Sequence, residues 1–175
     1  MKKFLLLAPL AFMMTLFCGC EALRQAKIEP AYVLTFYSKV QYPGQTDMIE
    51  TEIISPFDNK SYWVNSNQFF DSRNLEEIKM EQCPDDPERY YLYFKLTRMG
   101  VSRWTAMCGH NANNELILMV DGSFYTAFHQ SLRIVEDQKD WVKCDAKFDE
   151  YTARGIVDHA KDNYTYYNPD MNALF

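Results

Sequence analysis

The side chains best suited to chemistry are the cysteines, and two of them follow an apolar segment near the start of the chain. Lys2 and Lys3 precede segment 4–17, which is largely apolar and uncharged, and Cys18 and Cys20 come directly after it. A basic start, a short apolar run and a small residue at a cleavage point are the features of an export signal. When a cysteine follows that point, its thiol can receive acyl chains such as palmitate and become the N-terminus of a bacterial lipoprotein.

Cys20 is the predicted lipidation site. Gly19 is the small residue that the signal peptidase requires before the modified cysteine, whereas cleavage before Cys18 would place Phe17 at that position. Phe17 itself departs from the leucine that is usual in this motif. The apolar run is too short to span a bilayer, which takes about 20 apolar residues. An ordinary secretory signal and an uncleaved anchor are the alternatives.

This interpretation makes residues 1–19 a lipoprotein signal peptide and residues 20–30 a tether that ends at Pro30. Loss of Lys2 and Lys3 leaves 16 basic residues against 24 acidic ones, a net charge of −8. Such a balance argues against nucleic acid as a partner and disfavours electrostatic adhesion to anionic lipid. We therefore expect contact with the bilayer through acylated Cys20. The residue after Cys20 is Glu21 rather than Asp. In the sorting rule of proteobacteria this implies the outer membrane, if the cell is Gram-negative.

The remaining cysteines offer neither a metal site nor a fixed disulfide. Cys83, Cys108 and Cys144 are odd in number, so at most one bridge can form among them, and which of them pair stays open. They form no CxxC pair and no Cys/His cluster at zinc spacing. The sequence therefore predicts no metal and no cofactor.

No catalytic constellation stands out in the exported part. Its histidines are isolated from one another: His110, His129 and His159. Its paired acids lie at predicted loops or helix starts, where solvation and the helix dipole favour them: Glu76-Glu77, Asp85-Asp86 and Asp149-Glu150. Cys108 has a histidine only two residues away, which is not the usual spacing of a Cys/His dyad, and no GxSxG motif or glycine cluster is present. We expect a protein that is not an enzyme, with a small hydrolase with a dispersed site as an alternative.

The elements that would position these side chains follow from periodicity. Alternation and β-branched or aromatic content predict strands at 31–40, 48–54, 62–64, 90–96, 115–120, 123–130, 132–135 and 141–148. Asp121-Gly122 predicts a hairpin turn, and segment 83–88 reads as a loop. Asp71-Ser72 predicts the cap of a short helix running through Ile78.

Two longer helices carry an apolar stripe at i, i+3, i+4 and i+7. Thr97 would cap the first, which ends after Cys108, and Asp149 would cap the second, which runs to Asp162. The sequence therefore predicts one α+β domain over 31–162, mostly antiparallel sheet with two main helices packed on one face, and a C-terminal tail at 163–175. Aromatic residues make up 15% of the chain, so some must be exposed, where they could stack on sugars or form an interface; Tyr90, Tyr91 and Tyr93 cannot all face one side.

Segment 94–122 resembles the head subdomain of the first periplasmic domain of SecD and its fused form SecDF. The resemblance consists of Phe94-Lys95-Leu96-Thr97 followed by Gly100 and Trp104, and of an apolar strand, 116–120, that runs into Asp121-Gly122. A late helix after Phe148 extends the resemblance over residues 88–162.

The departures from that family bear on function. Thr126-Ala127-Phe128 stands where the family has an Ala-Pro element, and the family's transmembrane helices are missing, so the chain is not an export motor. The resemblance implies contact with a polypeptide. We expect a membrane-anchored envelope lipoprotein whose non-catalytic domain binds a protein or peptide partner. A carbohydrate-binding surface lipoprotein is the second alternative.

Overall fold

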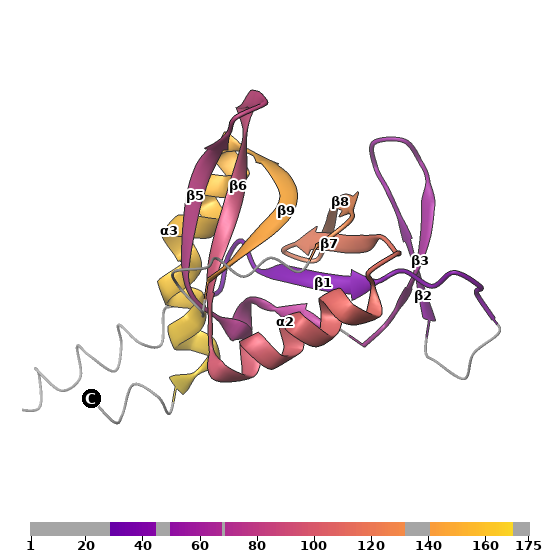
Figure 1. Ribbon diagram of the computed structural model, residues 1–175, viewed down its shortest axis with the longest axis horizontal. Coiled ribbons are helices and arrows are strands. Elements are labelled where there is room, and N and C mark those ends of the chain that lie inside the picture. Colours follow the sequence, from indigo (N-terminus) through magenta and orange to yellow (C-terminus); the bar gives the residue numbers. More distant parts are fainter. Residues whose placement is uncertain (1–28, 45–49, 68, 132–140, 170–175) are drawn as a thin grey trace, which may run out of the picture.

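A computed structural model describes residues 29–44, 50–67, 69–131 and 141–169 of the chain. Within these ranges the protein is α+β, as predicted, and every strand pair is antiparallel (Figure 1). Cys20 and the signal segment, the predicted strand 132–135 and residues 170–175 lie outside the described residues. In the part that is described, no helix is both long and apolar enough to cross a membrane.

The strands are divided among three sheets. The central sheet has the order β4-β1-β7-β8, formed by β4 (Phe70–Asp71), β1 (Leu34–Ser38), β7 (Leu116–Val120) and β8 (Ser123–Phe128). The turn between β7 and β8 is the predicted one, with positive φ at both Asp121 and Gly122. The Asp121 carboxylate also accepts hydrogen bonds from the amides of Tyr32 and Val33, at 3.0 and 2.8 Å. The hairpin thereby fixes the point where the chain enters β1.

A separate two-stranded hairpin projects from one end of the molecule (Figure 1). It consists of β2 (Glu50–Ile54) and β3 (Ser61–Asn65). The Val40 amide donates to the Trp63 carbonyl at 2.7 Å, which joins β3 to the chain leaving β1. The inner face of the hairpin packs on Ile117 of β7 through the buried side chains of Tyr62 and Val64.

The third sheet and the C-terminal helix form the other end of the molecule, and the second helix runs from there along the central sheet (Figure 1). The sheet has the order β5-β6-β9, formed by β5 (Leu75–Cys83), β6 (Asp86–Leu96) and β9 (Trp141–Asp149). Helix α3 (Glu150–Tyr167) packs along β5, and α2 (Arg98–His110) packs against β4 and β6. Their common core centres on Trp104, whose ring contacts those of Phe36, Phe70 and Phe94 edge to face at 5.1 to 6.0 Å.

Both predicted helix caps are confirmed. The Thr97 hydroxyl accepts from the Gly100 amide at 2.9 Å, and the Asp149 carboxylate accepts from the Thr152 amide at 2.9 Å. The Tyr125 hydroxyl donates to Asp149 and accepts from its amide, which ties β8 to the start of α3. Burial would raise the pKa of Asp149, but the hydrogen bonds from Thr152 and Tyr125 outweigh it and hold that pKa below its usual value.

The predicted helix through Ile78 is wrong. Asp71 does act as a cap, but of a single 3-10 turn, η1 (Ser72–Asn74), after which the chain enters β5. Leu75 and Ile78 are buried by pairing with β6, and this tertiary contact outweighs the local helical spacing. The predicted loop at 83–88 is also too long, because β5 continues through Cys83 and β6 begins at Asp86.

Helix α3 is longer than its apolar stripe predicts, since it continues past Asp162 to Tyr167. Asn163, which is buried, exchanges hydrogen bonds with the backbone of Ala31: the Ala31 amide donates at 3.1 Å and the Asn163 side chain donates to the Ala31 carbonyl at 2.7 Å. A polar residue here therefore belongs to the packed face, which the apolar pattern alone does not reveal.

Candidate functional site

The candidate catalytic groups are dispersed. The His110 and His159 rings each contact the carbonyl one helical turn earlier, at 2.7 and 2.9 Å, and His129 is exposed after β8. No group of three or more His, Cys, Asp or Glu side chains within the described ranges could hold a metal ion. Of the carboxylates predicted at loops and helix starts, Glu76 and Glu77 pair with Lys95, Asp85 with Lys147 and Glu150 with Arg154, while Asp149 caps α3.

Cys83, Cys108 and Cys144 are buried free thiols. Burial raises the pKa of all three, and that of Cys108 reaches about 11. A thiol with a raised pKa is a poor nucleophile near neutral pH, because little of it is thiolate. These side chains act as small apolar residues of the core.

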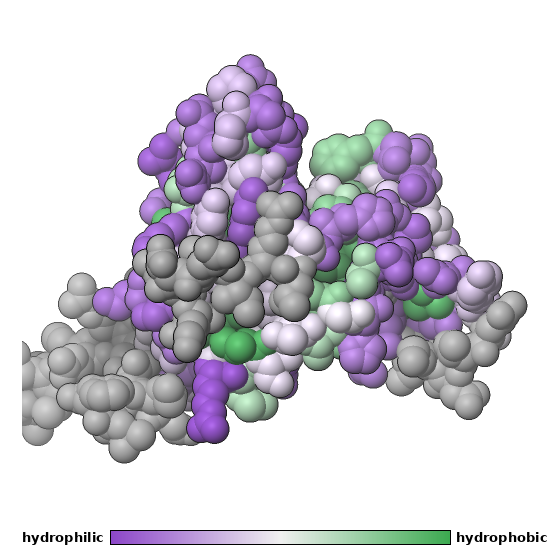
Figure 2. Space-filling model, viewed as in Figure 1, coloured by the Kyte–Doolittle hydropathy of each residue, from purple (hydrophilic) through white to green (hydrophobic). Residues whose placement is uncertain are grey.

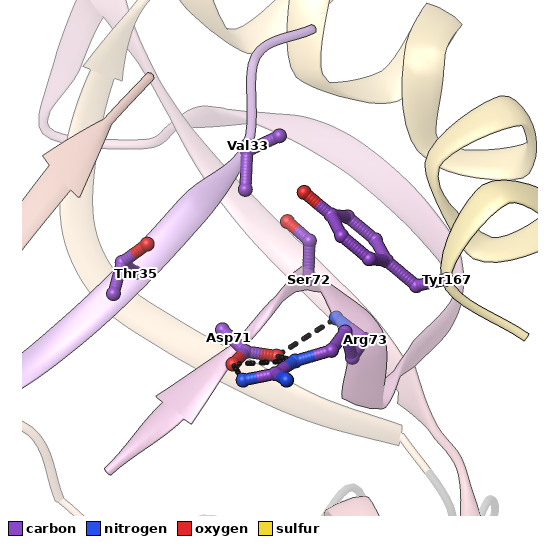
Figure 3. Close-up of a pocket in the computed structure, with 6 residues that line it drawn as sticks. All are labelled: Val33, Thr35, Asp71, Ser72, Arg73 and Tyr167. Atoms are coloured by element: carbon purple, nitrogen blue, oxygen red, sulfur yellow. Dashed lines mark hydrogen bonds and ion pairs between the residues drawn. The ribbon is translucent and has the colours of Figure 1, made fainter. Parts of the chain in front are cut away.

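A polar pocket of about 260 Å³ lies between the start of β1, η1 and the end of α3 (Figure 3). Asp71 is at its base and forms a bidentate ion pair with Arg73, whose guanidinium approaches to 2.5 Å. The Ser72 hydroxyl accepts from the Leu34 amide at 2.8 Å, and the Tyr167 ring lines the pocket on the side of α3. Because the carboxylate and the hydroxyl are both engaged in holding the backbone or an arginine, this pocket has a structural role.

Exposed apolar side chains gather on the other end of the molecule. We call Tyr42, Ile54, Phe57 and Trp63 the hairpin surface; their exposed fractions are 66, 60, 78 and 38%. Only three other large apolar side chains in the described part of the chain are as open to solvent, so this short region holds most of them. Figure 2 shows apolar atoms near the top of this lobe. Exposed apolar side chains that gather at one end of a molecule are candidates for an interaction site.

Strand register explains why these side chains point outward. Trp63 lies opposite Glu52, and Ile54 lies opposite Ser61, so all four share the face of the hairpin that does not meet the core. Tyr62 and Val64 alternate with Trp63 and occupy the inner face. Three successive apolar residues in β3 therefore make both faces apolar, a signal in the sequence that the prediction of exposed aromatics did not use.

The exposed rings do not form a flat platform. Phe57 contacts Phe124 with a centroid distance of 6.4 Å and an interplanar angle of 55°. The stacked pair here is Tyr62 with Phe124 at 5.4 Å, and Tyr62 is buried. Stacking on sugars relies on open, coplanar rings, and neither of these two ring pairs offers that arrangement. The tyrosines first considered, Tyr90, Tyr91 and Tyr93, are half-buried, and Lys143 covers the ring of Tyr91 at 3.3 Å.

The outer edge of the hairpin is open. In the two-stranded sheet β3 is joined on its far side through Lys39 and Val40, whereas β2 pairs with β3 alone among the described strands. An unpaired edge can accept an additional strand from another chain. The open edge would supply backbone hydrogen bonds to such a strand, and the exposed apolar side chains beside it would supply side-chain contacts.

No protein-family model and no curated protein matches this chain. Two solved structures of SecDF are similar to it. One is a crystal structure of SecDF in a super-membrane-facing form, with a TM-score of 0.43 and 15% sequence identity. The match covers 85% of this chain and 20% of the SecDF chain. The other is a structure of SecDF, a membrane component that enhances protein export, with a TM-score of 0.43 and 14% sequence identity. The match covers 85% of this chain and 66% of that SecDF chain. The likeness is one of fold alone.

Proposed function

We propose that this protein is a lipid-anchored envelope lipoprotein whose domain binds a protein partner and catalyses no reaction. The observation that carries the proposal is the hairpin surface beside an open strand edge. The partner segment is an extended polypeptide with apolar and basic side chains, since Glu50 and Glu52 stand in the same strand as Ile54 and the chain as a whole is acidic.

The exposed aromatic side chains of the hairpin surface can contribute to a specific contact. An aromatic side chain that is largely exposed in the free domain stabilises a complex by about 2 kcal/mol when it is buried, at roughly 25 cal/mol per Å². Phe57 is such a side chain, and Trp63, a larger ring, is exposed over 38% of its surface; interfaces commonly depend on a few residues of this kind. Removing either should weaken the complex by about 30-fold.

The test is photocrosslinking of the lipidated protein in its own envelope. A photoreactive amino acid at position 57 should give one main protein adduct, joined through a peptide with apolar and basic side chains. Position 151 is the matched control, because Tyr151 has an exposed fraction of 77% against 78% for Phe57 but lies on α3. Equal adducts from both positions, or adducts with glycan instead of protein, would contradict the proposed partner class.

The purified partner then allows a quantitative check. Phe57→Ser and Trp63→Ser should each weaken its binding, while Tyr151→Ser leaves the affinity within a factor of two. The anchor has a separate test: mass spectrometry of the native protein should find an acylated N-terminal Cys20. An unmodified Cys20 would refute the anchor and leave the binding surface to be judged by crosslinking.

A further inference from the structure

A groove lined by arginines lies beside the start of α2; its smaller part reaches the end of α3, and its larger part reaches the end of β3 at Asn65. Two adjoining hollows, of about 350 and 580 Å³, share the side chains of Arg73 and Arg103, and Arg98 lines the smaller one. We call these three residues the arginine groove. No carboxylate lines either hollow. In a chain with a net charge of −6, this is a local concentration of positive charge.

Much of that charge is uncompensated. Arg73 pairs with Asp71, but Arg98 and Arg103 form no ion pair within the described residues, and both are exposed. Guanidinium groups that converge on one hollow are suited to phosphate oxygens, which they can bind through two parallel hydrogen bonds.

Exposed apolar side chains accompany the arginines. Met99 lines the smaller hollow and has an exposed fraction of 64%. Tyr164 lines the same hollow, and Tyr166, which is 50% exposed, follows it at the end of α3. At this end of the molecule Figure 2 shows strongly hydrophilic atoms beside apolar ones. Arginine with exposed methionine and tyrosine is typical of surfaces that lie at the headgroup level of a bilayer.

The start of the domain, at Ala31, lies near this groove, and so the proposed anchor at Cys20 is near it as well. Ala31 is held by Asn163, which directly precedes Tyr164 of the groove. Residues 20 to 29 can extend at most about 30 Å, at roughly 3.3 Å per residue. An acylated Cys20 would therefore keep this end of the domain close to the bilayer, and the hairpin surface lies at the opposite end (Figure 1).

We propose that the arginine groove binds the phosphate groups of anionic lipid headgroups, with Met99 and Tyr166 entering the interface. The inference rests on the proposed lipid anchor for the nearness of the bilayer but not on the proposed protein partner. Bound in this way, the domain stands on the membrane with its acidic hairpin end turned away from it.

The experiment measures vesicle binding without the anchor. The mature chain carrying Cys20→Ser is mixed with phosphatidylcholine vesicles that contain or lack about 30% phosphatidylglycerol. Binding should need the anionic lipid and should weaken with added salt. Arg98→Ala and Arg103→Ala should each weaken binding about fivefold, as expected for one arginine near an anionic surface. Arg89→Ala is the charge-matched control, because Arg89 is exposed on β6.

Three results would overturn the inference: equal binding to both kinds of vesicle, equal losses for the groove variants and Arg89→Ala, and full displacement by inorganic phosphate at constant ionic strength. The third would assign the groove to a soluble phosphate compound. Circular dichroism checks that each variant is folded. Mass spectrometry of Cys20 and crosslinking from position 57 remain independent, so failure of the groove and failure of the proposed function are distinguishable.

Discussion

Replacing Gly100 with alanine tests how the first turn of α2 is seated. A Cβ atom at this position would lie 2.6 Å from the Asn74 carbonyl oxygen and 3.1 Å from the Thr97 hydroxyl. The carbonyl cannot turn aside, because it belongs to the backbone of η1 and accepts the Thr97 amide at 3.0 Å. Relief of the clash must therefore displace η1 or the helix cap.

The magnitude follows from three contributions. Overpacking of a well-filled site costs about 1–3 kcal/mol, and weakening a helix cap costs about 1 kcal/mol. Alanine offsets about 1 kcal/mol of this through its better helix propensity. We expect Gly100→Ala to lower the free energy of unfolding by about 2 kcal/mol, which corresponds to a fall in Tm of about 4–8 °C for a protein of this size.

Gly109 provides the control within the same helix. Nothing lies within 4 Å of a Cβ atom at Gly109, so alanine there should leave stability unchanged or raise it by about 0.5 kcal/mol. Urea unfolding of the mature protein, followed by circular dichroism, measures both variants. If Gly100→Ala proves as stable as Gly109→Ala, the close contact between η1 and α2 is refuted as the reason for glycine at this position.

Three further predictions concern the sheet and the core. Tyr125→Phe should lower the free energy of unfolding by about 1–2 kcal/mol in urea titrations, because both hydrogen bonds to Asp149 are lost. Folding lowers the pKa of Asp149, so this carboxylate stabilises the fold above the usual carboxyl pKa, and the stabilisation is lost as pH falls through the lowered value. Asp149→Asn should therefore flatten the fall in stability below about pH 4. Alkylation at pH 8 should spare Cys83, Cys108 and Cys144 in the native protein and should modify all three after unfolding without reductant. Fewer than three modified thiols in the unfolded protein would mean that a disulfide forms.

The sequence was sufficient to predict the hairpin turn and the two helix caps, because neighbouring residues form each of them. Asp121-Gly122 supplies two residues that tolerate positive φ, and the hairpin forms there. Thr97 and Asp149 each place an oxygen acceptor before an amphipathic segment, and both cap the helix that follows. In each case the stabilising interaction lies within three residues of the signal.

Segment 72–78 was mispredicted because its fate depends on a distant strand. Leu75 and Ile78 have the spacing of a short helix, but β6 offers an antiparallel partner that buries both along its length. The division of the strands into three sheets has the same origin. Which strands pair is decided by contacts between segments far apart in the sequence, and Trp104 joins them through rings contributed by β1, β4 and β6.

The candidate surfaces were missed for a different reason, since exposure is a property of the assembled fold. Arg73, Arg98 and Arg103 are separated in the sequence and converge only because η1 leads into β5 and α2 starts beside η1. The acidic balance of the whole chain pointed away from anionic lipid, and a local cluster of charge escapes such an average.

The two exposed apolar surfaces differ in the charges beside them, and this difference decides which one suits a membrane. Glu50 and Glu52 accompany Ile54 and Trp63 on the hairpin, and an anionic bilayer would repel them. Met99 is accompanied by arginines, which anionic headgroups attract. If the hairpin were the membrane-binding element, Glu52→Lys should strengthen binding to anionic vesicles more than Arg98→Ala weakens it. We expect the opposite, because Glu52 lies on the hairpin, away from the proposed contact with the bilayer, whereas the arginine groove makes that contact.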